Sequence, residues 1–189
     1  THSCIHTDGV VVQLPFPAHI DIDKVLQSIP PQYDIDGVNY DGSNEKVLPP
    51  VVGAIKEISD RHDILFAAQK VTVVGQGRLV GRPAEIWAQR QGAQVEVVTK
   101  TTNNIDSSVK SAHILILGAG QAGLIKPDMV SDNVVIFDAG TSEEGGELKG
   151  DAHADCAARA SLFTPVPGGI GPITVAVLLR NLVHLASRQ

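Results

Sequence analysis

The chain has 189 residues, enough for one large domain or two small ones with a buried core. Hydrophobic residues make up 43% and charged residues 19%, which is ordinary for a globular protein, and no apolar run is long enough to span a bilayer. The net charge of −6 argues against nucleic acid or an anionic membrane as the main partner.

The first part of the chain is predicted to contain a strand, a short helix, a loop and a second helix. The strand is expected over Val10–Leu14 and the short helix over Ile22–Ile29, with the side chain of Asp21 as its N-cap. The segment PPQYDIDGVNYDGSN is polar and rich in glycine and proline, as a functional loop would be. The second helix is expected over Pro50–Arg61, with prolines at its start, where they are tolerated.

From Lys70 onward, short runs rich in β-branched residues alternate with helical segments. Near-continuous apolar strands that alternate with helices predict a parallel sheet covered on both faces. We therefore expect an α/β, Rossmann-like, doubly wound parallel sheet over Lys70–Phe163. A final amphipathic helix over Gly171–Ser187 is expected to pack away from this sheet, on the N-terminal part. The strand-like runs are KVTVVG, QVEVVT, HILILG, NVVIFD and SLFT.

Two glycine-rich turns compete as the phosphate-binding turn of a dinucleotide site. GQGRLVG (75–81) follows the first strand of the sheet and is followed by a helical segment. GAGQAG (118–123) matches GxGxxG literally and has Asp138 at the end of the next strand, as an unrelated NAD-linked dehydrogenase would. The motif needs a helix N-terminus that faces the pyrophosphate, and Pro127 interrupts any long helix after GAGQAG. We predict that Gly75–Gly77 hold the phosphates and that GAGQAG touches the cofactor from the side.

The end of the second strand indicates which dinucleotide is bound. NAD sites usually have an acid here that binds the ribose 2′-hydroxyl, whereas this chain has VVTKTTNN. Lys100 and its threonine neighbours suit a 2′-phosphate and hence NADP. An ordinary solvated loop, and NAD as the cofactor, stay open as alternatives.

Cysteine usage bears on the compartment. Cys4 and Cys156 are far apart and form no CxxC pair, so a reduced, cytoplasmic setting is the simplest interpretation. We predict no metal site. The chain opens at Thr1, almost directly on an apolar run, which leaves open a preceding segment that is absent from this chain.

Several motifs together resemble the bifunctional methylenetetrahydrofolate dehydrogenase/methenyltetrahydrofolate cyclohydrolase (FolD) family. VQLPFP (12–17), DIDG (34–37) and TPVPGGIGPIT (164–174) occur in this order, with GQGRLVGRP and GDAHADCAARASLFTPVPGG as supporting signals. The resemblance covers nearly the whole chain. It implies a cytoplasmic, NADP-dependent homodimer that acts on tetrahydrofolate derivatives in one-carbon metabolism and purine biosynthesis.

The resemblance also implies a division of the chain. Residues 1–55 would be the remainder of a folate-binding catalytic domain of α/β type, and residues 56–165 the NAD(P)-binding Rossmann domain. Residues 166–189 would form the PGGIGP loop and the helix that returns to the catalytic domain. Folate would then bind in the cleft between the two domains.

Site residues follow from the same resemblance. Gln13 and Asp36 are the implied catalytic residues; Asp36 would also bind the pterin, since a carboxylate can accept two hydrogen bonds from an aminopyrimidine edge. A strand-end cap at Gln13 and a turn former at Asp36 are the structural alternatives. The implied substrate-binding residues are Asp36, Pro167, Gly168, Gly169 and Pro172, and the implied cofactor-binding residues are Gly75, Gln76, Gly77, Arg78, Thr99, Lys100, Thr101, Gly118, Ala119, Gly120 and Thr141.

The chain departs from the family pattern in three places. It contains no YxxxK motif, the source of the family's general-acid/base lysine; VLPP replaces the PCTP turn; and Gln76 stands where many members have arginine. We therefore expect a methylenetetrahydrofolate dehydrogenase that by itself lacks cyclohydrolase activity. The alternative is a truncated or non-catalytic nucleotide-binding relative.

Overall fold

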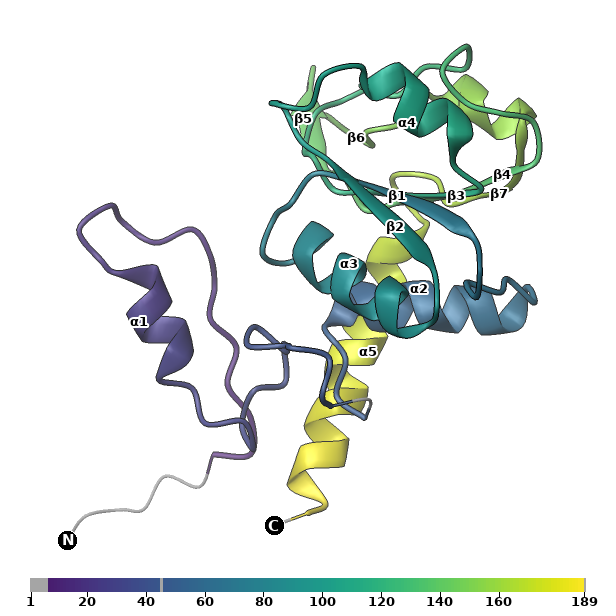
Figure 1. Ribbon diagram of the computed structural model, residues 1–189. Helices are drawn as coiled ribbons and strands as arrows, with labels where there is room; N and C mark the ends of the chain where they lie inside the picture. The colour runs from purple at the N-terminus through teal and green to yellow at the C-terminus, as the bar shows by residue number, and fades with distance from the viewer. Residues whose placement is uncertain (1–6, 45, 189) are drawn as a thin grey trace, which may run out of the picture.

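The computed structural model describes residues 7–44 and 46–188, and its centre is a five-stranded sheet in the order β2-β1-β3-β4-β7 (Figure 1). Every neighbouring pair of strands is parallel, which confirms the predicted doubly wound α/β sheet. The five strand-like runs of the sequence all form strands. Their bounds are β1 Lys70–Val74, β2 Gln94–Val98, β3 Ile114–Leu117, β4 Val134–Asp138 and β7 Ala160–Phe163.

Strand alternation explains why both faces of the sheet are covered. Ile114 and Ile116 of β3 pack with α2 and α3 on one face, whereas Leu115 and Leu117 pack with α4 on the other. Because successive side chains of a strand point to opposite faces, a fully apolar strand needs cover on both sides. The covering helices are α2 (Pro50–Arg61), α3 (Gly81–Arg90) and α4 (Ile105–Ser111), together with the 3-10 helix η1 (Ala154–Ala158).

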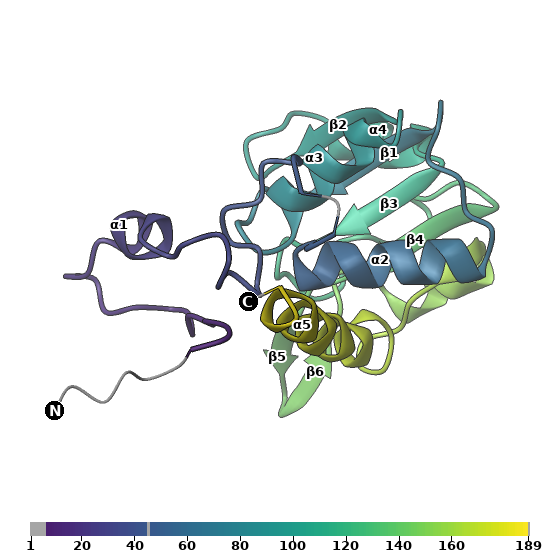
Figure 2. The ribbon, with the colours of Figure 1, turned by 90° about the horizontal axis from the view of Figure 1, so that it is seen from below.

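The last helix, α5 (Ile170–Ala186), lies beside α2 and reaches the N-terminal part of the chain (Figure 2). The buried side chain of Asn181 donates hydrogen bonds to the carbonyls of Ile35 (2.9 Å) and Leu48 (2.8 Å). Leu185 packs with Ile35 and Val47. The expected return of this helix to the N-terminal part is therefore confirmed.

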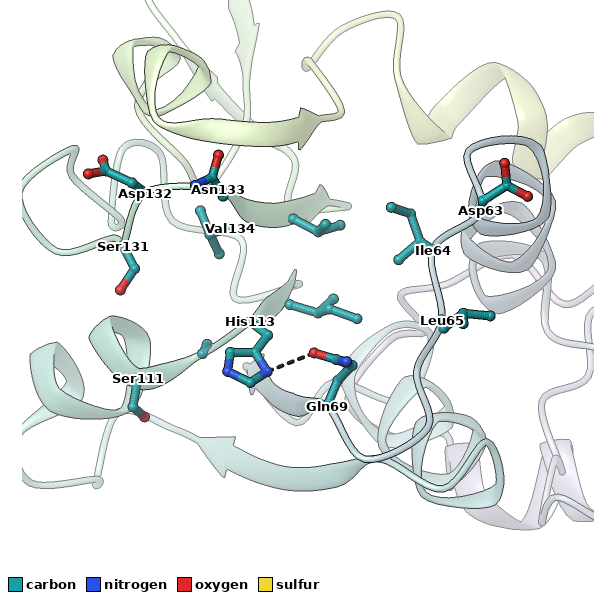
Figure 3. A pocket seen from close by; sticks show the side chains of 13 residues that line it. Asp63, Ile64, Leu65, Gln69, Ser111, His113, Ser131, Asp132, Asn133 and Val134 are labelled. Atoms are coloured by element: carbon teal, nitrogen blue, oxygen red, sulfur yellow. Dashed lines mark hydrogen bonds between the residues drawn. The ribbon is translucent and has the colours of Figure 1, made fainter.

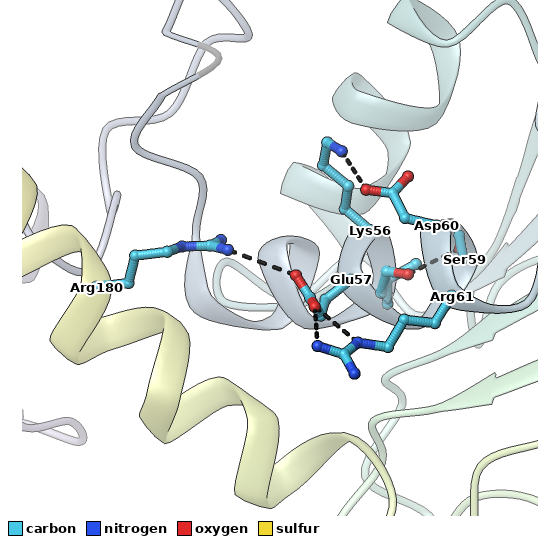
Figure 4. A network of polar contacts seen from close by, with 7 residues as sticks. Lys56, Glu57, Ser59, Asp60, Arg61 and Arg180 are labelled. Carbon is cyan, nitrogen blue, oxygen red and sulfur yellow. Dashed lines mark hydrogen bonds and ion pairs between the residues drawn. The ribbon is translucent and has the colours of Figure 1, made fainter.

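Charged side chains also join α5 to α2. Glu57 of α2 accepts from Arg61 (2.7 Å) and lies 3.6 Å from Arg180 of α5 (Figure 4). These groups are exposed or half-exposed, and such pairs contribute little to stability. Packing decides the contact instead, because Gly53 of α2 leaves room for Val177 of α5.

The N-terminal part differs from prediction in one element. Val10–Leu14 does not form a strand: Val10 alone makes a parallel bridge, to Asp34. The described residues offer no further partner for the backbone beyond Val10, and a strand without a ladder is not stable. The helix α1 (Ile22–Gln27) does form, and Asp21 caps it by accepting from the Lys24 N–H at 3.2 Å.

A short hairpin of β5 (Ser142–Glu144) and β6 (Glu147–Lys149) was not predicted from the sequence. In the part of the chain that the structure describes, no helix is long and apolar enough to cross a membrane. The same residues contain no group of three or more His, Cys, Asp or Glu side chains placed to hold a metal ion. His2, His6 and Cys4 lie outside the described residues.

Candidate functional site

A pocket of about 470 Å³ opens where β1, β2 and β3 end. Nucleotides bind at the carboxyl ends of the strands in open parallel sheets, next to the strand from which the order runs both ways. Here that strand is β1, since β2 lies on one side of it and β3 on the other. The residues that line the pocket are Val74, Gly75, Gln76, Gly77, Val98, Thr99, Lys100, Thr102, Ile105, Gly118, Ala119, Gln121 and Leu124.

The first glycine turn is shaped by close backbone contacts. Gly75 has a φ of 95°, and a Cβ there would lie 2.6 Å from the carbonyl oxygen of Gly118. A Cβ at Gly81 would lie 2.0 Å from the carbonyl oxygen of Gly75, so α3 can begin against the strand end only with glycine there. Gly77 lines the pocket, and the nearest heavy atom to a Cβ there would be 3.9 Å away. The turn is tight toward the sheet and open toward the pocket.

The backbone of this turn has hydrogen-bond donors to offer. Within the described chain, the N–H groups from Gln76 to Val80 donate to no protein group, and α3 begins directly after them. Free N–H groups at a helix N-terminus, together with the helix dipole, favour an anion such as a pyrophosphate. The geometry fits the phosphate-binding role that we predicted for this turn.

The second glycine turn is engaged inside the protein instead. The carboxylate of Asp151 accepts from the N–H groups of Ala119 (2.6 Å), Gly120 (3.2 Å) and Gln121 (2.7 Å). Asp151 is fully buried, and no helix follows the turn. The N–H groups of Ala119, Gly120 and Gln121, in the literal GxGxxG match, are therefore not available to a dinucleotide.

Asp138, the acid that would bind the ribose if GAGQAG were the phosphate turn of an NAD site, is also hydrogen-bonded inside the protein. Its carboxylate accepts from the N–H groups of Gly140 (2.9 Å), Asp151 (3.1 Å) and Ala152 (2.8 Å). Burial raises the pKa of Asp138 to about 6, although these donors oppose the shift. The side chain is 1% exposed and cannot reach a ribose in the pocket.

The residues after β2 form a compact turn in which threonine hydroxyls lie beside Lys100. The Thr99 N–H donates to Oγ1 of Thr102 at 2.9 Å, and the hydroxyls of Thr99 and Thr101 lie 2.9 Å apart. Lys100 is exposed and lines the pocket. The turn thus places an ammonium and hydroxyls at the pocket rim, where we predicted a 2′-phosphate site.

The predicted cofactor residues divide into two groups. Gly75, Gln76, Gly77, Thr99, Lys100, Gly118 and Ala119 line the pocket. Arg78, Thr101, Gly120 and Thr141 do not, and Arg78 instead forms an ion pair with Asp23 of α1. Sequence analysis did not single out the apolar lining residues Val74, Val98, Ile105 and Leu124, which carry no motif of their own.

The two aspartates of DIDG have different surroundings. The buried Asp34 accepts from the N–H groups of Val38 (3.1 Å) and Asn39 (3.2 Å), so it forms the turn. Asp36 is half-buried and accepts no hydrogen bond from any described residue. Burial, and secondly the charge of Asp34, raise the pKa of Asp36. Asp36 is therefore the carboxylate that is free to bind a ligand.

Asp36 lies in a second pocket, of about 200 Å³, between the DIDG loop, the start of α2 and α5. Its lining includes Arg78, Thr174 and Val175. Gln13 does not line this pocket; its side chain is exposed and donates to the carbonyl of Leu14 at 3.1 Å. The bridge from Val10 to Asp34 does bring the segments of Gln13 and Asp36 together.

The loop PGGIGP needs its glycines for more than one reason. Gly168 has a φ of 101° and open space around it, so only its backbone conformation demands glycine. A Cβ at Gly169 would lie 2.5 Å from the carbonyl oxygen of Pro165, which is an internal clash. Pro167, Gly168 and Pro172 are exposed.

A larger hollow of about 650 Å³ lies at the opposite edge of the sheet (Figure 3). Gln69 precedes β1 and His113 precedes β3, and their side chains are hydrogen-bonded at 2.7 Å. The hollow is thus at the amino ends of the strands, opposite to the edge where open parallel sheets bind cofactors.

Comparison with known proteins agrees with this geometry. Residues 49–189 match the family model of the tetrahydrofolate dehydrogenase/cyclohydrolase NAD(P)-binding domain. The bifunctional protein FolD of Lactobacillus acidophilus is 35% identical over 189 residues, an alignment that covers 96% of this chain and 67% of that protein.

Two solved structures are similar over the same part of their chains. The bifunctional FolD of Campylobacter jejuni has a TM-score of 0.91 at 32% identity, covering 96% of this chain and 67% of that one. The FolD of Trypanosoma brucei, solved with NADP and an inhibitor, has a TM-score of 0.85 at 30% identity, with the same coverage. The chain therefore belongs to the tetrahydrofolate dehydrogenase/cyclohydrolase family and contains its NAD(P)-binding domain.

Proposed function

We propose that the chain binds NADP and carries the hydride-transfer part of a 5,10-methylenetetrahydrofolate dehydrogenase. The observation that carries this proposal is the first glycine turn: Gln76 and Gly77 line the same pocket as Lys100, and their N–H groups donate to no described protein group. The NADP complex of the Trypanosoma brucei relative supports the choice of nucleotide.

In this proposal each part of the site positions a ligand. The N–H groups from Gln76 to Val80 hold the pyrophosphate, and Lys100 with the Thr99–Thr102 hydroxyls binds the 2′-phosphate. Asp36 accepts hydrogen bonds from the aminopyrimidine edge of the folate, and Gln13 offers a neutral amide near the centre that becomes cationic. The bound NADP supplies the hydride acceptor. The protein contributes orientation and exclusion of water rather than covalent chemistry.

We propose the same division of the chain as the sequence implies, with residues 56–165 as the cofactor domain and residues 1–55 and 166–189 on the folate side. The contacts between Asn181 and the carbonyls of Ile35 and Leu48 support placing the last helix with the folate side. A homodimer remains a prediction, which light scattering of the purified chain would test.

Hydrolysis of the methenyl product requires a group that moves protons to and from the attacking water. The sequence has no YxxxK motif, and Gln13 cannot titrate. We propose that this chain, tested as it stands, releases methenyltetrahydrofolate without accelerating its hydrolysis.

The test follows NADPH formation and methenyltetrahydrofolate absorbance together, with the chain, methylenetetrahydrofolate and NADP. Appearance of both products, with hydrolysis at the non-enzymatic rate, is the expected result. Accelerated hydrolysis would show that another group supplies the base. NADP binding without turnover would favour the second candidate, a non-catalytic nucleotide-binding relative.

A further inference from the structure

Two loops pack against the side chain of Asp151, which itself follows β6 at the edge of the candidate cofactor pocket. Its carboxylate accepts from three successive N–H groups of the loop after β3, at Ala119, Gly120 and Gln121. The loop after β4 is packed against the same carboxylate, because a Cβ at Gly140 would lie 2.1 Å from its Cγ. A single buried carboxyl group therefore fixes the shape of two loops at the edge of the sheet.

A second layer holds Asp151 itself. Its own N–H and that of Ala152 donate to the carboxylate of Asp138, at 3.1 and 2.8 Å. A Cβ at Gly150 would lie 2.3 Å from Asp138 Oδ2, so this contact also depends on a glycine. The amide of Ile125 donates to the Asp151 carbonyl at 2.9 Å, which ties the segment to the loop after β3 a second time.

The topology indicates which part of a dinucleotide these loops would meet. With the pyrophosphate at the turn after β1 and the adenosine ribose at the end of β2, the other nucleoside must lie over β3 and β4. Ala119 and Gln121 line the pocket on that side. Both are residues whose N–H groups Asp151 holds.

We propose that Asp151 is a positioning residue: its carboxylate occupies the N–H groups of GAGQ and holds this loop as the surface for the nicotinamide half of the nucleotide. The inference rests on the proposed function, since it presumes that the pocket binds NADP. It explains why the literal GxGxxG match is not the phosphate turn. The carboxylate of Asp151 accepts the backbone N–H groups that would donate to a phosphate in a phosphate-binding GxGxxG turn.

The first experiment compares NADP with 2′,5′-ADP, which has the phosphorylated adenosine half but no nicotinamide half, by calorimetry on the whole chain. In Asp151→Asn the side-chain NH₂ group is a donor and cannot accept from the backbone N–H groups of the loop after β3. This loop must therefore shift. NADP binding should weaken by about tenfold, roughly the value of one hydrogen bond to a charged group, while 2′,5′-ADP binding stays within about twofold. The control is Asp155→Asn, which makes the same substitution at an exposed aspartate on η1. It should change the affinity for neither NADP nor 2′,5′-ADP.

Equal losses for both ligands would show a merely structural role and overturn the inference, as would no loss for either. If the wild-type chain binds neither ligand, the proposed function fails instead, so the two failures are distinguishable.

A second measurement needs no variant. In the wild-type chain, amide exchange at Ala119, Gly120 and Gln121 should be slow without nucleotide, because Asp151 already holds these groups. NADP should slow exchange mainly at Gln76–Val80, whose N–H groups are free. Fast exchange at 119–121 that becomes slow only with NADP would mean that this turn binds the phosphates, and would overturn the inference.

Discussion

Lys100 carries the cofactor preference in our proposal. It lies at the rim of the pocket at the end of β2, with the hydroxyls of Thr99 and Thr102 beside it. Lys100→Glu should weaken NADP binding by about tenfold or more, because a charge-assisted contact to the 2′-phosphate becomes a repulsion, and should change NAD binding little. Affinities for both nucleotides, measured by fluorescence titration, check this.

Lys70→Glu is the matched control, since it makes the same charge change at the start of β1, at the opposite edge of the sheet. It should leave both affinities unchanged. Equal losses of NADP and NAD in Lys100→Glu would reject a 2′-phosphate role for this lysine.

Asp36 is the residue on which folate binding should depend. Asp36→Asn should raise the folate KM by about tenfold or more and leave NADP binding unchanged, since a directional contact to a charged acceptor is worth roughly 1.5–3 kcal/mol. Asp34→Asn should instead lower stability, because that carboxylate holds the Val38 and Asn39 amides. Steady-state kinetics and urea unfolding of both variants separate the two roles. A normal folate KM in Asp36→Asn would make Asp36 an ordinary loop residue.

Single residues at the candidate pocket could be predicted from the sequence where a local motif requires them, and not where the interaction partner is distant in the chain. The open turn at Gly75–Gly77 and the cation at Lys100 could be found because strand, turn and helix follow one another. The role of Asp151 could not be found, although its segment was noticed. Its partners are the amides of Ala119–Gln121, about thirty residues earlier, and only the folded chain brings them together.

At the scale of elements, the apolar runs of the sheet were predictable because a strand buried on both faces has no polar positions. The helix α2 was predicted with its observed bounds, Pro50–Arg61, because proline marks its first turn. The prediction of a strand over Val10–Leu14 was wrong, because an apolar run by itself does not provide a neighbouring strand to pair with. The hairpin of β5 and β6 escaped prediction because its strands are exposed and charged.

The contact between α2 and α5 depends on a glycine that helix propensity would disfavour. A Cβ at Gly53 would lie 2.6 Å from Cγ1 of the buried Val177. Gly53→Ala should therefore lower the free energy of unfolding by about 1–3 kcal/mol, although alanine favours the helix by about 1 kcal/mol. Urea unfolding followed by circular dichroism measures the change.

Gly171 of α5 provides the matched control, since a Cβ there would meet nothing within 4 Å. Gly171→Ala should be neutral or stabilise by up to about 1 kcal/mol. The same sign of effect at both positions would contradict the packing argument.

For the whole molecule, Asp138 makes stability depend on pH. Its pKa is about 6 in the folded protein against an ordinary value of 3.8, so the folded state binds this proton more tightly. The contribution is fully present only below the unfolded-state pKa, at about pH 3, and is lost as the pH rises through about 6, a change of about 3 kcal/mol in all.

The side chain of the Asp138→Asn variant does not titrate. The difference in stability between the wild type and this variant therefore isolates the contribution of the Asp138 carboxyl. Between pH 4 and pH 7 the wild type should lose about 2.4 kcal/mol of stability relative to the variant. Urea midpoints at several pH values give both curves. A constant difference across this range would show that the buried carboxyl does not titrate there.

The hydrogen bonds of Asn181 have a consequence for the order in which the protein forms. Asn181 is 146 residues from Ile35 and 133 from Leu48 along the chain, and α5 is the last helix. A ribosome makes the DIDG loop well before its partner in α5. We expect nascent chains stalled before α5 to be cut by protease near Asp36 while the sheet around β1 and β3 resists. The folate side of the molecule would then be completed only as synthesis of this region ends.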